Sequence, residues 1–67
     1  MRHARLRRGV YCADIVPDRF FPRSLFHYVV MREGSKDILA WGQERSENAA
    51  LAEAEHQIRR LQETQVA

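Results

Sequence analysis

Two runs rich in aromatic and β-branched residues flank one short turn in the middle of this chain, and they limit its fold more than any other feature. The first run covers residues 25–32 and the second covers residues 37–43. Gly34 and Ser35 lie between them as a two-residue loop, with glycine at the first central position, where a tight hairpin turn needs positive φ. The pattern predicts an antiparallel β-hairpin.

The hydrophobic period changes from two to about 3.6 after this hairpin. Ser46 is a suitable N-cap, Glu47 lies in the first turn, and neither glycine nor proline occurs from there to Ala67. One apolar face follows at helical spacing, made of Ala50, Leu51, Ala54, Ile58 and Leu61. The sequence therefore predicts one amphipathic helix that ends near Glu63 and is long enough to cover the hairpin.

The segment before the hairpin is less regular. Residues 10–16 alternate well enough to form a third strand, and Pro17 and Pro22 then interrupt regular structure. We expect Phe20 and Phe21 to plug an edge of the core from this segment. The predicted fold is α+β, with a small antiparallel sheet of two to three strands covered on one face by a single C-terminal amphipathic helix, in the order βββα or ββα.

Charge is divided unevenly along the 67 residues. Residues 1–32 hold seven arginines against two aspartates, a net +5, whereas residues 33–67 hold four basic against seven acidic side chains, a net −3. A basic head of this kind suggests a nucleic acid or an acidic protein as partner, or else a solvated tail. We expect three parts: a basic flexible arm at 1–9, a single domain at 10–63 and a frayed tail at 64–67.

The pairing of the predicted hairpin decides which residues share a face. With Gly34 and Ser35 as the loop, paired positions sum to 69, which sets Tyr28 opposite Trp41, Val30 opposite Leu39, and Arg32 opposite Asp37. Both faces are then apolar, and a single helix covers only one. The other face, the predicted protein interface, carries Phe26, Tyr28, Val30, Leu39 and Trp41. The N-terminal segment with its phenylalanines, a second copy of the chain or a ligand could cover it.

Features of catalytic and metal-binding proteins are missing from the sequence. It contains no phosphate-binding glycine loop, nucleophile elbow or HExxH motif, and its histidines and Cys12 have no paired ligand spacing. We predict no enzyme activity, no metal, no cofactor and no small-molecule substrate. One cysteine favours a reducing, cytoplasmic location, and no stretch approaches the roughly 20 apolar residues of a membrane span.

The stretch from Phe26 to Leu61 combines an aromatic strand, a turn containing Gly34 and Lys36, a strand ending at Gly42 and an alanine-rich helix. With a basic segment before it, this order resembles the arm-type-site-binding N-terminal domains of phage tyrosine integrases, and similar strand-strand-helix units occur in double-stranded RNA-binding domains. The resemblance implies that the exposed sheet face enters the DNA major groove while basic residues hold the backbone. The implied contacts are Arg2, Arg5, Arg7, Arg8, Arg32 and Lys36.

This sequence also departs from the integrase pattern, because the Asp-Pro-x-x-Gly-type turn and the recombinase domain are absent. The resemblance therefore implies an accessory nucleic-acid-binding protein, for DNA more than RNA, without integrase activity. The alternative is a homodimeric protein-interaction module, an adaptor or inhibitor that uses the second apolar face. The arginines of the arm favour the first hypothesis, and the apolar face around Trp41 favours the second.

Overall fold

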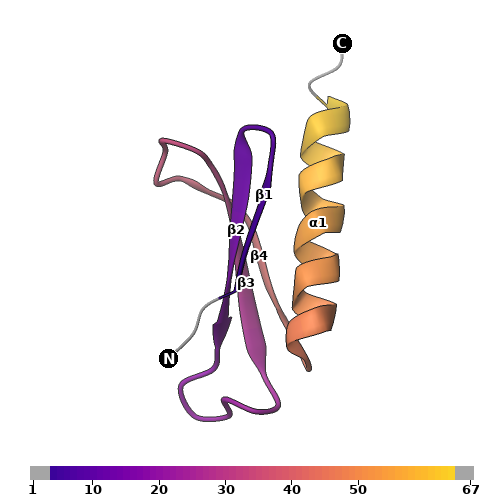
Figure 1. Cartoon of the computed structure of the whole chain (residues 1–67). Helices are drawn as coiled ribbons and strands as arrows, with labels where there is room; N and C mark the ends of the chain where they lie inside the picture. Colours follow the sequence, from indigo (N-terminus) through magenta and orange to yellow (C-terminus); the bar gives the residue numbers. More distant parts are fainter. Residues whose placement is uncertain (1–3, 65–67) are drawn as a thin grey trace.

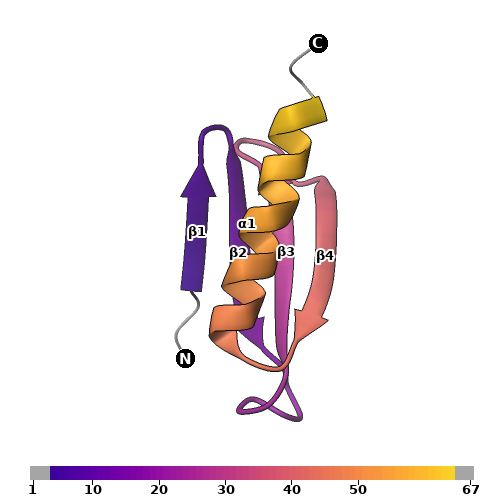
Figure 2. The same cartoon turned by 90° about the vertical axis from the view of Figure 1, so that its right-hand side faces the viewer.

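A four-stranded antiparallel sheet and one helix form two layers in the computed structural model, which describes residues 4–64. In chain order the elements are β1 (Ala4–Arg8), β2 (Tyr11–Pro17), β3 (Phe26–Arg32), β4 (Ile38–Glu44) and α1 (Glu47–Thr64). Each strand pairs with the next along the chain. Figure 1 shows the sheet edge-on with α1 on one side, and Figure 2 shows α1 running along the strands. The predicted α+β class is confirmed, but the sheet has four strands rather than two to three.

The helix begins where the sequence predicts. Ser46 caps it, because its Oγ accepts a hydrogen bond from the backbone nitrogen of Ala49 at 3.1 Å, while its carbonyl accepts from Ala50 at 3.0 Å. The buried helical residues are Ala50, Ala54 and Ile58, which belong to the predicted apolar face. The last turn includes Thr64, whose hydroxyl donates to the carbonyl of Leu61 at 2.8 Å. Residues 65–67 of the predicted tail lie outside the described residues.

Strand β1 corrects the prediction of a flexible arm for residues 4–8. These residues pair with β2 from Ala4 opposite Ile15 to Arg8 opposite Tyr11. Gly9, at φ 60°, is the first residue of the two-residue turn to β2. A tight hairpin turn needs positive φ at this position, and glycine adopts it without strain. Ala4 and Leu6 of β1 face the helix layer and are half-buried. The arginines of the strand are exposed, and Arg5 pairs with the carboxylate of Asp14. Residues 1–3 of the predicted arm lie outside the described part of the chain.

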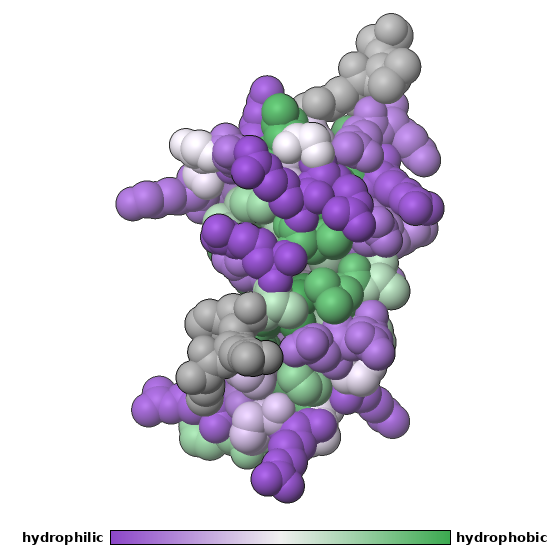
Figure 3. Space-filling model, in the orientation of Figure 1, coloured by the Kyte–Doolittle hydropathy of each residue, from purple (hydrophilic) through white to green (hydrophobic). Residues whose placement is uncertain are grey.

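The core lies between α1 and the two central strands. Its buried members are Tyr11, Ala13, Ile15, Tyr28, Val30, Ala50, Ala54 and Ile58. The alanines of the helix are small enough to let α1 approach the sheet closely, and the larger sheet residues fill the space between the layers. Figure 3 shows hydrophobic residues in the middle of the molecule and hydrophilic residues over most of the rest. The buried apolar layer between α1 and the sheet is therefore thin, as expected for a chain of this size.

The pairing of β3 with β4 differs from the predicted register. The connection covers residues 33–37, and Gly34, at φ 82°, lies in a turn closed by a 3.0 Å bond from the Ser35 nitrogen to the Arg32 carbonyl. Met31 pairs with Ile38, as predicted, but Leu39 is an extra residue in a β-bulge. Beyond the bulge the predicted register is wrong by one residue.

The bulge decides which side chains share a face. Val30 pairs with Ala40, Val29 with Trp41, and Tyr28 with Gly42. The predicted interface of Phe26, Tyr28, Val30, Leu39 and Trp41 is therefore not one surface. Tyr28 and Val30 are buried under α1, and Phe26 packs against the same core. Leu39 lines a hollow with helical residues that include Leu61, and Trp41 points to the opposite side of the sheet.

Gly42 leaves room for the ring of Tyr28. A Cβ at this position would lie 2.5 Å from the Tyr28 Oη and 2.6 Å from its Cζ, which is closer than any ordinary contact. The small side chains of Ala40 and Gly42 thus face the helix layer, and the bulky Trp41 between them faces away. The observed pairing of β3 with β4 therefore requires a small residue opposite Tyr28.

We predict that Gly42→Ala lowers the free energy of unfolding by about 1–3 kcal/mol, because the new methyl group overlaps the Tyr28 ring. Urea-induced unfolding measures the change. The control is Gln43→Ala, an exposed neighbour on the same strand, whose stability should stay within about 0.5 kcal/mol of the wild type. Equal stabilities for the two variants would contradict the close approach of Tyr28 to this strand.

Candidate functional site on the open face of the sheet

The side of the sheet that faces away from α1 carries no other described element, and we call it the open face (Figure 1). The strand pairing arranges its side chains in three rows. These rows are Val16, His27 and Gln43; Arg5, Asp14, Val29 and Trp41; and Arg7, Cys12, Met31 and Ile38. The face is therefore a shallow platform built by all four strands.

The half of the open face on β3 and β4 is apolar. Trp41 is 72% exposed and Ile38 is 57% exposed, and beside them lie the half-buried side chains of Val29 and Met31. Trp41 is the single tryptophan of the chain. Large exposed apolar side chains that gather in this way on a small protein mark a surface for binding.

The half on β1 and β2 is polar, and its charges are paired. Arg5 Nε donates to Asp14 Oδ1 at 2.9 Å, and this bond raises the pKa of the guanidinium. Arg7 forms an ion pair with Glu33 in the β3–β4 connection. On the other side of the sheet, Arg8 Nε lies 3.1 Å from Glu55 Oε1 of α1. Carboxylates of the same chain thus partly neutralise three arginines of the predicted nucleic-acid site.

The structure brings only part of the predicted nucleic-acid site together. Arg5, Arg7 and Arg32 line a hollow of 290 Å³ at one end of the open face, with Cys12 at its wall. Arg8 faces the helix, Lys36 is exposed in the β3–β4 connection, and Arg2 lies outside the described residues. Whether these residues contact nucleic acid stays a prediction.

The β2–β3 loop, residues 18–25, corrects the expectation that its phenylalanines plug the core. Phe20 is 79% exposed and Phe21 is 61% exposed. Arg19 and Arg23 flank them, and both arginines are exposed. The signal in the sequence is the run Arg-Phe-Phe-Pro-Arg, which interleaves aromatic and basic side chains.

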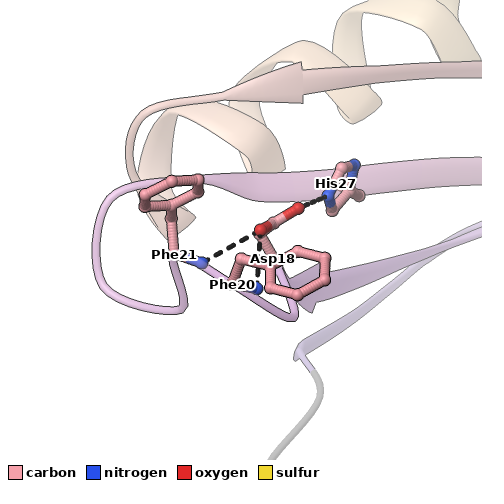
Figure 4. Close-up of polar contacts among 4 residues, drawn as sticks. All are labelled: Asp18, Phe20, Phe21 and His27. Carbon is pink, nitrogen blue, oxygen red and sulfur yellow. Dashed lines mark hydrogen bonds and ion pairs between the residues drawn. The ribbon is translucent and has the colours of Figure 1, made fainter.

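Asp18 holds this loop in shape (Figure 4). Its Oδ2 accepts hydrogen bonds from the backbone nitrogens of Phe20 at 2.8 Å and Phe21 at 3.0 Å, and its Oδ1 lies 2.6 Å from His27 Nε2. Its own nitrogen donates to the Leu25 carbonyl at 2.8 Å, which closes the loop. The bond to His27, followed by the bond from Phe20, lowers the pKa of the Asp18 carboxyl.

Two further findings concern residues 4–64. No group of three or more histidine, cysteine, aspartate or glutamate side chains is placed to hold a metal ion in this part of the chain. The helix that the structure describes there is not apolar enough to cross a membrane.

Comparisons with protein-family models, with curated proteins and with solved structures find no match to this chain. The resemblance to integrase arm-binding domains therefore stays a prediction that depends on the residues of the hairpin, the helix and the basic N-terminal segment.

We predict that Asp18→Asn destabilises the fold at neutral pH and that the difference from the wild type closes in acid. The folded-state pKa of Asp18 lies below its ordinary value of 3.8, so its contribution is fully present above about pH 4 and is lost as the pH falls through the folded pKa. Urea unfolding from neutral to acid pH measures both proteins. Asp37→Asn, which alters an exposed aspartate in another loop, is the control, and a constant difference for Asp18→Asn at all pH values would contradict the assignment.

Proposed function

We propose that this protein is a non-catalytic binding module that associates with a second copy of itself through the open face of its sheet. The observation that carries the proposal is the exposure of Trp41 beside Val29, Met31 and Ile38, on a sheet face that α1 does not cover. Burial of aromatic and aliphatic side chains is the dominant favourable term in most protein association. A second copy supplies an equal apolar surface to cover this one.

The edges of the sheet are poor sites for such an association, which favours the face. The β1 edge is short and carries Arg5, Arg7 and Arg8. The β4 edge contains the bulge at Leu39, which interrupts regular pairing. Charged side chains and bulges are the means by which natural sheets prevent edge-to-edge pairing.

The charges of the open face also support a second copy as the partner. Arg5 and Asp14 lie side by side in the same row as Trp41, so in this row each copy presents one basic and one acidic group beside its apolar residues. In a two-fold interface each arginine can meet the aspartate of the other copy, and the same contact forms twice. This row of the open face is thus self-complementary in charge as well as partly apolar.

The size of the open face sets the expected strength of the dimer. The sheet has three strands of seven residues and one of five, which cover about 400 Å² at about 4.8 Å between strands and about 3.3 Å per residue. An interface of standard size buries about 800 Å² of accessible surface from each partner. The side chains project from the sheet and so increase its accessible surface beyond this flat area. Even so, an interface of standard size would have to include the whole open face. We therefore expect a reversible dimer with a dissociation constant on the order of micromolar rather than a permanent one.

Trp41→Glu should abolish this association, because a charged side chain would be buried without a partner in the apolar half. In sedimentation experiments over a range of concentrations, the wild type should move from 7.9 kDa towards twice that mass. For the variant we expect a dissociation constant about 30-fold higher or more. Ala52→Glu, which adds the same charge on the exposed side of α1, should behave as the wild type does.

Two native reporters make the test specific for the open face. Trp41 and Cys12 are the single tryptophan and cysteine of the chain, and both lie on this face. With rising concentration the emission of Trp41 should shift to shorter wavelength and alkylation of Cys12 should slow. A wild type that stays monomeric, or a dimer that leaves both reporters unchanged, would refute the proposal.

A further inference from the structure

The β2–β3 loop is a second surface, separate from the open-face interface proposed above, and it carries a different chemistry. Phe20 and Phe21 are adjacent in sequence and largely exposed, and they lie between Arg19 and Arg23. No acidic residue occurs in residues 19–25. The loop therefore presents two aromatic rings flanked by two arginines, and its single acidic residue is Asp18.

Hydrogen bonds within the chain hold the loop in shape. One carboxylate, that of Asp18, binds the backbone nitrogens of both phenylalanines, and its second oxygen is engaged by His27 on β3. The Phe21 carbonyl accepts hydrogen bonds from the nitrogens of Ser24 at 3.2 Å and Leu25 at 3.0 Å. A partner that uses the exposed rings would therefore meet a loop that is already in place, with little conformational entropy to lose.

We propose that the β2–β3 loop binds single-stranded nucleic acid, with bases stacked on Phe20 and Phe21 and phosphates held by Arg19 and Arg23. Every base has an aromatic face, so stacking on phenylalanine tolerates many sequences. The guanidinium fork of arginine matches the geometry of phosphate. Binding of this kind requires unpaired bases, because the bases of an intact duplex are already stacked on one another.

A lipid surface fits this end of the molecule less well. The loop lies at the end where β4 finishes and α1 begins (Figure 2), and Glu44 and Glu47 are located there with Arg45. A flat anionic membrane that reached the phenylalanines would also approach these carboxylates. A flexible single strand can contact the loop alone, so the distribution of charge favours nucleic acid.

The experiment uses the full chain and a fluorescently labelled oligothymidylate, with binding followed by anisotropy. If two phosphates are neutralised, the affinity should fall about sevenfold between about 50 and 200 mM salt. Arg19→Ala/Arg23→Ala should weaken binding and remove most of this salt dependence. Arg59→Ala/Arg60→Ala, which removes the same charge from exposed positions on α1, should leave binding within about twofold because surface charge away from the loop contributes little.

The double variant Phe20→Leu/Phe21→Leu separates stacking from simple hydrophobic contact. It keeps apolar side chains but removes the aromatic rings, and we expect a loss of about fivefold or more for the oligonucleotide. Both positions are exposed, so the variant should keep the circular dichroism of the wild type. The same proteins are tested against phosphatidylserine-containing vesicles and a duplex of equal length.

Three results would overturn the inference. They are failure to bind the oligonucleotide, binding that the leucine variant retains in full, and preferential binding to the vesicles or the duplex. The dimer proposal is not affected by any of them, since Trp41→Glu changes the open face and leaves the loop intact. Conversely, a monomeric protein that binds the oligonucleotide through the loop would refute only the dimer.

Discussion

The approach of Tyr28 to the backbone of Gly42 is the contact on which the two faces of this sheet depend. Because a Cβ does not fit between them unless the Tyr28 ring moves, glycine is favoured opposite Tyr28, and the bulge at Leu39 places Gly42 there. One residue of shift would set Trp41 against Tyr28 under the helix and turn Gly42 outward. The register therefore creates both the thin core beneath α1 and the apolar half of the open face.

The elements with strong local signals could be predicted from the sequence, and those set by distant contacts could not. The helix after Ser46 and the hairpin around Gly34 depend on capping, period and turn residues that are close together in the chain. The bulge depends on a steric contact between Tyr28 and Gly42, and no local pattern contains that information. Periodicity alone therefore placed Trp41 on the wrong side relative to Tyr28 and Val30.

The charge pairing of the basic N-terminal segment likewise could not be predicted from local sequence. Its arginines look like a free arm in the sequence, but their partners lie 9, 26 and 47 positions away, at Asp14, Glu33 and Glu55. These pairs are at least half exposed on the arginine side, so they contribute little stability. They still place the arginines along a strand edge. The exposed phenylalanines of the β2–β3 loop were missed for a related reason, since hydrophobic residues in a short chain are first assigned to its core.

The order of the strands has a consequence for the speed of folding. Every strand pairs with its neighbour in the chain, so each hairpin closes a short loop and the whole sheet forms without a crossover. Low sequence separation between partners is the property that makes small domains fold quickly. The contacts with the largest sequence separation are those between β1 and α1, at the two ends of the described region. Docking of α1 against β1 therefore requires the longest loop closure among the described elements, whereas each hairpin closes over a much shorter segment.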